Sequence, residues 1–153
     1  MFRGWAVGLA AAGLVALGAG CGDELERGTL EVATGGGIVR LDVELAVSAD
    51  ERRRGLMDRS SLPERSGMLF LYRENSRRGF WMKDTLIPLS IAFLDARGRV
   101  LRILDMEPCT RDPCPVYEAG IAYRSALEMN QGAFARLGIE VGDVATLSKQ
   151  SDG

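Results

Sequence analysis

Histidine is absent from the 153 residues of this chain, and that absence excludes several kinds of chemistry. Without an imidazole there is no Ser-His-Asp or Cys-His nucleophile system. His-containing zinc sites and the usual proton shuttle at neutral pH are excluded for the same reason. Any reaction would therefore have to use carboxylates, Lys, Tyr, hydroxyl groups or Cys.

An excess of basic residues is also missing. The formal net charge is −2, with 19 Lys and Arg against 21 Asp and Glu. Arg3 is the only charge among residues 1–20, so the rest of the chain is slightly more acidic. Nucleic-acid-binding domains favour a basic surface, and we expect no nucleic-acid partner. The apolar fraction of 46% and the charged fraction of 26% are ordinary for one globular domain.

The first 21 residues, MFRGWAVGLAAAGLVALGAGC, have the layout of a secretory signal peptide. One early positive charge precedes a run rich in Ala, Leu, Val and Gly, and small residues precede Cys21. A membrane-spanning anchor is the alternative, because the run is close to the minimum spanning length. Its Gly content and its small-residue end favour export, with residues 1–20 as the signal peptide.

The segment LGAGC, Leu17 to Cys21, resembles a bacterial lipobox, which implies that Cys21 becomes the lipidated first residue of the mature chain. An ordinary cleaved signal is the alternative. Lipidation would hold the domain at a membrane surface through acyl chains alone. We therefore expect a tether over residues 21–28, a single globular domain over 29–148 and a tail over 149–153. The expected location is the periplasmic side of the cell envelope.

Two cysteines remain after Cys21, and they lie close together in EPCTRDPCPVY. Cys109 and Cys114 in an exported domain are expected to form a local disulfide. A redox pair or a metal site is the alternative. A redox pair usually has closer spacing, and a metal site would need further ligands, so we expect neither a metal nor a cofactor. The Met residues are scattered along the chain and form no closely spaced copper-binding motif, so we interpret them as residues of the hydrophobic core.

Short alternating segments indicate a mainly β fold, α+β by strict count. Residues 39–47 alternate apolar and polar side chains, and Gly35 to Gly37 can turn a hairpin. Ser48 and Glu51 form a capping box for a short helix, and Asn130 is expected to cap a second one. The sum is seven or eight short strands with two short helices, in a small β-barrel or a sandwich-like domain.

The run GFWMKDTLIPLSIAFLD is the richest candidate for a site. Phe80, Trp81, Lys83 and Asp84 could form a platform on which aromatic faces pack against apolar or sugar-like rings while the charges fix orientation. A core strand followed by a solvated turn is the alternative. In either case Phe80 and Met82 are expected on one strand face and Trp81 on the other.

Arg59 and Glu128 complete the candidate site. Glu128 lies between Leu127 and Met129 in an expected strand, so it should face away from them. A covered Glu needs a partner, and Arg59 or Lys83 could supply it. The alternative is a structural ion pair or an exposed side chain. The arginines of ERRRGLMDR could meet an anionic ligand or lipid headgroups, although a solvated helix face is favoured.

Three blocks, RGLMDRSSLPERSGMLFLY, FWMKDTLIPLSIAFLD and ALEMNQGAFARLGIEVGD, resemble the bacterial and archaeal family known as domain of unknown function 192. The resemblance covers about Thr29 to Leu147. It implies a compact, mostly β domain that is often exported or lipid-anchored, and it implies no settled activity. Asp84 and Ser90 stand where the family commonly has Asn and Asp.

Three functions are compatible with these features. The first is a binding or accessory module of the cell envelope for an unknown small molecule or envelope component, with no enzyme activity expected. The second is a hydrolase or lyase that uses Asp84 and Glu128 as paired carboxylates, with Lys83 stabilising charge. The third is a structural or protein-interaction lipoprotein, which would expose an apolar patch.

Overall fold

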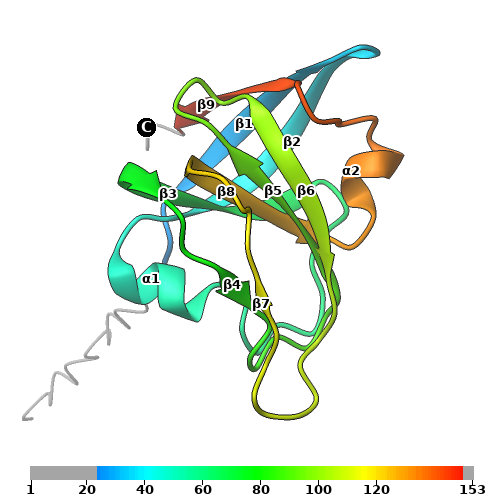
Figure 1. Ribbon diagram of the computed structural model, residues 1–153. Coiled ribbons are helices and arrows are strands. Elements are labelled where there is room, and N and C mark those ends of the chain that lie inside the picture. The colour runs from blue at the N-terminus through cyan, green and yellow to red at the C-terminus, as the bar shows by residue number, and fades with distance from the viewer. Residues whose placement is uncertain (1–23, 150–153) are drawn as a thin grey trace, which may run out of the picture.

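The computed structural model describes residues 24–149 (Figure 1). The expected signal peptide, the expected lipidation site Cys21 and residues 150–153 of the tail lie outside the described residues. Within these bounds the chain folds into nine strands and two short helices, which confirms the mainly β expectation. They are β1 (Arg27–Thr34), β2 (Gly37–Ala46), α1 (Ala49–Arg54), β3 (Ser66–Ser76), β4 (Phe80–Trp81), β5 (Leu89–Leu94), β6 (Val100–Met106), β7 (Val116–Tyr117), β8 (Tyr123–Asn130), α2 (Ala133–Arg136) and β9 (Val144–Lys149).

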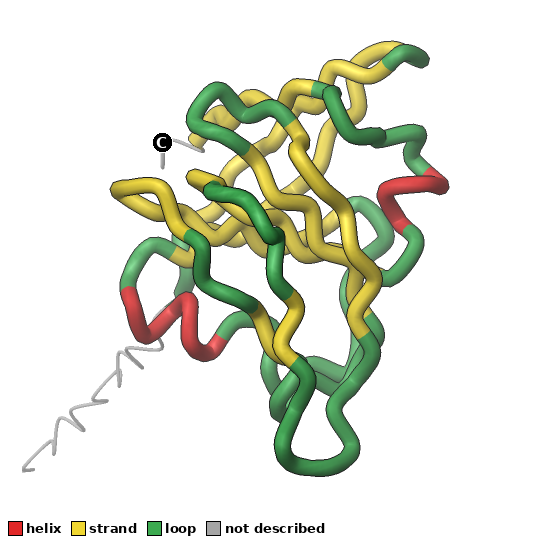
Figure 2. The backbone as a smooth tube through the Cα atoms, in the orientation of Figure 1, coloured by secondary structure: helices red, strands yellow, loops and turns green. Residues whose placement is uncertain are grey.

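Seven strands form one sheet in the order β6-β5-β8-β3-β2-β1-β9, and β4 pairs with β7 in a separate two-stranded sheet. Every neighbouring pair is antiparallel except β2 and β3. The larger sheet curls until its two edges meet at one isolated bridge, Arg99 with Val144 (Figure 2). No ladder joins β6 to β9 between residues 24 and 149, so the expectation of a closed barrel is wrong and the sandwich-like alternative fits.

Local signals in the sequence account for the first elements. β1 and β2 form the expected hairpin, with Gly35 and Gly36 in the turn. The expected capping box starts α1. The Ser48 hydroxyl accepts from the Glu51 amide, and the Glu51 carboxylate accepts from the Ser48 amide. Gly55 ends the helix at φ 50°, a conformation that favours glycine.

Two helical expectations are wrong. Ser61 and Glu64 repeat the capping-box spacing around Pro63 and indicate one more helical turn, but residues 61–63 are irregular and residues 64–65 form a turn. Asn130 is the last residue of β8 and donates to the Leu62 carbonyl at 2.8 Å, whereas α2 begins after Gly132 without a side-chain cap. The Asn130 side chain thus joins the end of β8 to the loop at Leu62. The chain is still extended at Asn130, where the capping pattern predicted the start of a helix.

The larger sheet buries apolar side chains on both faces. One cluster lies inside the curl, under α2, and includes Leu127 and Met129. The other lies between the sheet and the β4–β7 ribbon, and includes Phe70, Phe80 and Phe93. All six residues of β5 are buried, so this strand is covered on both faces. The ribbon and α1 are therefore the layer that covers the outer face (Figure 1).

Among residues 24–149, no helix is long and apolar enough to cross a membrane.

Candidate functional site

The β4–β7 ribbon holds Phe80 and Trp81 on opposite faces. Phe80 is 8% exposed, and its ring meets those of Phe70 and Phe93 edge-on, with centroids 5.1 and 5.8 Å away. Trp81 is 47% exposed and lies opposite Val116 in the ribbon. Alternation in the strand predicted these two faces. Phe80 therefore anchors the ribbon in the core, and Trp81 is the aromatic ring that a ligand could reach.

Glu128 projects from β8 into the layer beneath the ribbon. Its register partners are Met68 on β3 and Ile91 on β5, both fully buried apolar side chains. Glu128 is 5% exposed, its carboxyl oxygens are not fully enclosed, and it makes no hydrogen bond or ion pair with any residue that the structure describes. Burial raises the pKa of this carboxyl to about 8, so most of it is protonated at neutral pH.

A small cavity of about 30 Å³ lies against Glu128, and we call it the Glu128 pocket. Its volume suits one or two water-sized groups. Its lining combines the end of α1, the start of the next loop, the ribbon and the buried Glu. The lining residues are Arg52, Arg53, Arg54, Gly55, Leu56, Met57, Phe70, Phe80, Trp81, Thr85 and Glu128.

The close approach of α1 to the core shapes this pocket. A Cβ atom on Gly55 would lie 3.3 Å from the Phe70 ring, so the helix end packs its backbone directly on that ring. The Arg52 guanidinium donates to the carbonyls of Val47 and Leu71. It also lies 4.9 Å from the centroid of the Tyr72 ring. These contacts fix α1 as one wall of the pocket.

Of the six side chains predicted for the site, three line the pocket: Phe80, Trp81 and Glu128. Arg59 lies elsewhere and pairs with Glu44, with nitrogen–oxygen distances of 2.9 and 2.5 Å. Hydrogen bonds from Arg59 lower the pKa of Glu44. The partners suggested for Glu128 are thus engaged with other carboxylates, because Lys83 lies 3.6 Å from Asp112.

Asp84 is exposed at a turn and is not among the described residues that line the Glu128 pocket. Its carbonyl accepts from the Asp58 amide at 2.8 Å, and both aspartates have positive φ, 52° and 61°. Asp tolerates this region better than most residues. The geometry therefore does not bring Asp84 and Glu128 together as a carboxylate pair in that pocket.

Sequence reasoning missed Arg54, Met57 and Thr85 as neighbours of Glu128. Thr85 is 7% exposed and donates to the Lys83 carbonyl at 3.2 Å, which closes the turn after the ribbon. The arginines were noted as a group, but nothing in their spacing indicated that they face a strand more than seventy residues away. Only the packing of α1 on the sheet brings them together.

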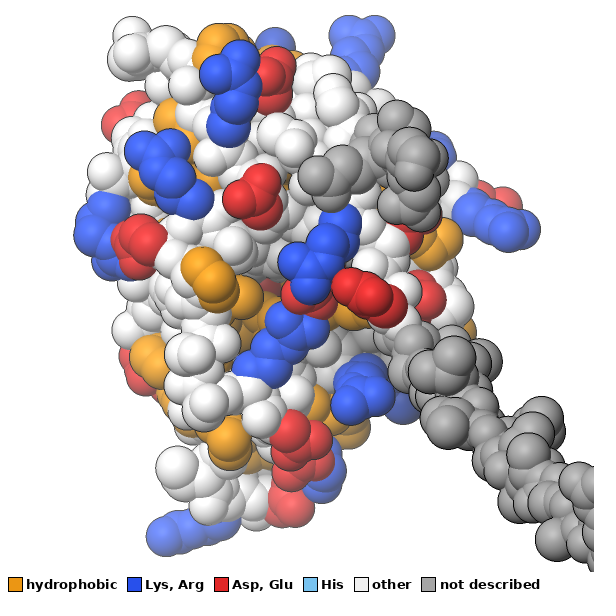
Figure 3. All heavy atoms as spheres, turned by 180° about the vertical axis from the view of Figure 1, so that it is seen from behind, with side chains coloured by type: hydrophobic (Ala, Val, Ile, Leu, Met, Phe, Trp, Pro, Cys, Tyr) orange, Lys and Arg blue, Asp and Glu red, His pale blue; other side chains and the backbone are white. Residues whose placement is uncertain are grey.

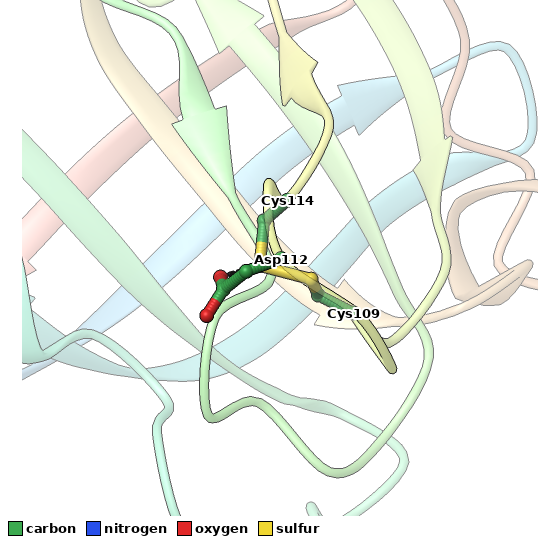
Figure 4. A group of neighbouring side chains, drawn as sticks. All are labelled: Cys109, Asp112 and Cys114. Atoms are coloured by element: carbon green, nitrogen blue, oxygen red, sulfur yellow. Dashed lines mark hydrogen bonds between the residues drawn. A yellow bond between two sulfur atoms is a disulfide. The ribbon is translucent and has the colours of Figure 1, made fainter.

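Cys109 and Cys114 form the expected disulfide in the loop before β7 (Figure 4). The donor atoms of these cysteines and of Asp112 lie within 4.8 Å of one another. Bonded sulfurs carry no thiolate, so with the disulfide intact only the carboxylate could act as a ligand. The Cys109 amide donates to the Met82 carbonyl at 3.4 Å, and the loop thereby supports the ribbon.

Charge on the rear surface is mixed. Figure 3 shows basic and acidic side chains interspersed over this face, with no broad region of one sign.

Comparison with known proteins places the chain among proteins of unknown function. Residues 30–147 match the model of the family DUF192, described as an uncharacterized ACR. A crystal structure of a proposed transcription regulator from Sinorhizobium meliloti 1021 is similar, with 29% identity and a TM-score of 0.76. The match covers 81% of this chain and 95% of that one.

A protein of unknown function from Novosphingobium aromaticivorans DSM 12444 is similar at 33% identity and a TM-score of 0.74. That match covers 80% of this chain and 86% of the other. No curated protein matches. The family match spans most of the described residues and includes both the ribbon and Glu128. This chain therefore belongs to the DUF192 family.

Proposed function

We propose that this chain is a small-ligand-binding module of the cell envelope, and that its ligand binds at the Glu128 pocket. The observation that carries the proposal is Glu128 itself. An unpartnered carboxyl group in an apolar layer costs stability, and a protein rarely keeps one without a use. A ligand hydroxyl could use the vacant hydrogen-bonding capacity of the carboxyl.

Trp81 supports a ring-shaped ligand. Trp81 is among the residues that line the pocket, and its exposed side chain offers an apolar face to a second ring, such as the C–H face of a sugar. The cavity is too small to enclose a whole ring. The ligand would therefore lie on Trp81 and insert one hydroxyl group toward Glu128.

Fluorescence of Trp81 tests this proposal. The full chain has two Trp residues, so a Trp5→Phe variant leaves Trp81 as the sole reporter. We expect acrylamide to quench Trp81, and D-glucose, D-glucuronate or D-glucosamine to protect it. Adding Glu128→Leu, which replaces the carboxyl group with an apolar side chain of similar size, should remove that protection. If none of the three sugars protects Trp81, the pocket does not bind hydroxylated rings and the proposal fails.

Export and lipidation at Cys21 belong to the same proposal, and the signal-like N-terminus supports them. Metabolic labelling with radioactive palmitate should tag the full chain, and Cys21→Ser should abolish the label. A labelled Cys21→Ser protein would contradict lipidation at that residue. An unlabelled wild-type protein that is released as a shorter soluble chain would instead favour an ordinary cleaved signal.

The S. meliloti relative raises regulation of transcription as another function. The net charge of −2 and the mixed surface do not favour binding to DNA, so we do not extend that description to this chain.

A further inference from the structure

Three arginines line the Glu128 pocket, and they differ in what else they contact. Arg52 is held by two backbone carbonyls and the Tyr72 ring. Arg53 pairs with Asp50 at 2.6 Å. Arg54 makes no hydrogen bond or ion pair with any part of the chain that the structure describes. Its guanidinium is thus the only one of the three that is free to bind a ligand without losing another contact.

Two of the residues that line the pocket therefore carry uncommitted polar groups of different character. Arg54 offers a permanent positive charge with several N–H donors, which suits a carboxylate. Glu128 offers a buried carboxyl that is mostly neutral at pH 7, because burial raises its pKa to about 8. A neutral carboxyl does not repel an anion, and it can donate one hydrogen bond and accept others.

The same groups argue against a cationic ligand. Three of the residues that line the pocket are arginines, and their positive charges would repel an ammonium group. A protonated Glu128 supplies no charge to compensate for that repulsion. An amine would have to deprotonate Glu128 in an apolar layer, which is unfavourable until a strong ion pair forms.

The neighbouring surface limits how much negative charge the ligand can carry. A larger hollow of about 620 Å³ shares Arg54, Gly55 and Met57 with the Glu128 pocket. The residues that line that hollow are net acidic, with five acidic side chains, Glu24, Glu44, Asp50, Glu51 and Asp58, against the arginines Arg27, Arg54 and Arg59. A polyanion extending from Arg54 into the hollow would meet these carboxylates, so a ligand with one anionic group fits better.

We propose that the ligand is an acidic sugar, meaning a pyranose ring that carries one carboxylate. The ring packs on Trp81, the carboxylate binds Arg54, and one ring hydroxyl inserts toward Glu128. This inference rests on the proposed function and adds the chemical class of the ligand. Arg54 and Glu128 act as binding residues, and no bond in the sugar is broken.

Three sugars with the same ring test the charge preference. D-Glucuronate, D-glucose and D-glucosamine carry a carboxylate, no charge and an ammonium group. In the Trp5→Phe chain at pH 7 and low salt, acrylamide protection of Trp81 gives each Kd. We expect glucuronate to bind about tenfold more tightly than glucose, because one charge-assisted hydrogen bond is worth about that factor. Glucosamine should bind more weakly than glucose.

Arg54→Gln tests the residue. It should weaken glucuronate binding about tenfold, which would bring it close to glucose. Arg53→Gln is the matched control, because it removes the same charge from the same turn of α1 but from a guanidinium already paired with Asp50. That control should weaken glucuronate binding by less than about twofold, through the loss of general positive charge.

The outcomes separate this inference from the proposed function. If glucose protects Trp81 and glucuronate binds no more tightly, the acidic-sugar inference is overturned and the binding module stands. If none of the three sugars binds, both fail. A preference for glucuronate that persists in Arg54→Gln would also overturn the inference, because the carboxylate would then bind elsewhere.

Discussion

At the scale of single residues, two glutamates that are removed from solvent to different degrees have pKa values shifted in opposite directions. Glu44 is paired with Arg59, and its pKa is lowered by the hydrogen bonds it accepts. Glu128 has no partner among the described residues, and its pKa is raised by burial. A paired glutamate stabilises the fold, whereas an unpaired buried one reduces stability once it ionises. Glu128 therefore calls for an explanation by function, and Glu44 does not.

The Glu44–Arg59 pair should contribute measurably to stability. In a double-mutant cycle with Glu44→Gln and Arg59→Gln, urea unfolding should give a coupling energy of about 1 kcal/mol, because the pair is bidentate and partly buried. The exposed pair Arg40–Glu31 is the control and should couple by less than about 0.5 kcal/mol. Equal coupling in both pairs would show that burial adds nothing to the first.

At the scale of elements, the point where the two edges of the sheet meet depends on a glycine. Gly98 lies in the turn between β5 and β6 at φ 77°. Its carbonyl accepts from the Ala145 amide at 2.8 Å, and a Cβ at Gly98 would collide with the Ala145 carbonyl oxygen. The turn and β9 therefore approach as closely as backbones can. Without that approach the curled sheet would lose one of the backbone contacts between its edges.

Gly98→Ala should lower the free energy of unfolding by more than about 2 kcal/mol, because it adds backbone strain and a collision with β9. Gly138→Ala is the matched control. Gly138 also has positive φ, 69°, but a Cβ there would meet nothing within 4 Å. That control should cost about 1 kcal/mol from strain alone. Chemical denaturation of both variants measures the difference, and similar losses would mean that the collision is relieved without cost.

Elements specified by near neighbours in sequence could be predicted, and those set by packing could not. The β1–β2 turn and the capping box of α1 each depend on residues within a few positions, and both predictions are confirmed. The pairing of β4 with β7 joins residues more than thirty positions apart. No periodicity in the sequence indicates such a pairing. The expected closed barrel was wrong for the same reason, since strand pattern predicts strands and not whether two edges pair.

In the candidate site, too, the features set by neighbouring residues could be predicted and those set by packing could not. Alternation correctly predicted that Trp81 lies on the face opposite Phe80 and that Glu128 faces away from Leu127 and Met129. It could not predict the partner of either residue. Arg59 was an equally reasonable partner for Glu128 on charge alone, but the described structure pairs it with Glu44 on β2. An ion pair between segments that are distant in sequence depends on how those segments pack. The pattern of residues in a single sequence does not show that packing.

At the scale of the whole molecule, one buried carboxyl should control how stability changes near neutral pH. Glu128 has a pKa of about 8 in the folded chain and an ordinary value of about 4.3 when unfolded. Between these values the folded state holds a proton that the unfolded state has lost. Stability therefore falls as pH rises through this window, and the full contribution of the neutral carboxyl is present only below pH 4.3.

Carboxyls with lowered pKa act in the other direction and in another window. The pKa of Glu44, Glu51 and Glu64 is held below the usual range by hydrogen bonds. Their stabilising effect is present above the unfolded value of about 4.3 and is lost as pH falls through their folded values. Acid below about pH 4.3 therefore weakens the fold through these glutamates, and rising pH between about 4.3 and 8 weakens it through Glu128, so the two effects can be measured separately.

Glu128→Gln should remove the loss of stability that wild type shows as pH rises from about 4.3 to 8. Gln is a neutral side chain of the same shape, so its variant has no proton to lose between pH 5 and 8. Relative to this variant, the wild-type free energy of unfolding should fall by about 1.4 kcal/mol per pH unit over that range and level off above pH 8. Urea unfolding of both proteins at half-unit steps measures the difference. Parallel curves from pH 5 to 8 would mean that Glu128 ionises normally in the folded chain, and the apolar layer around it would then have to admit water.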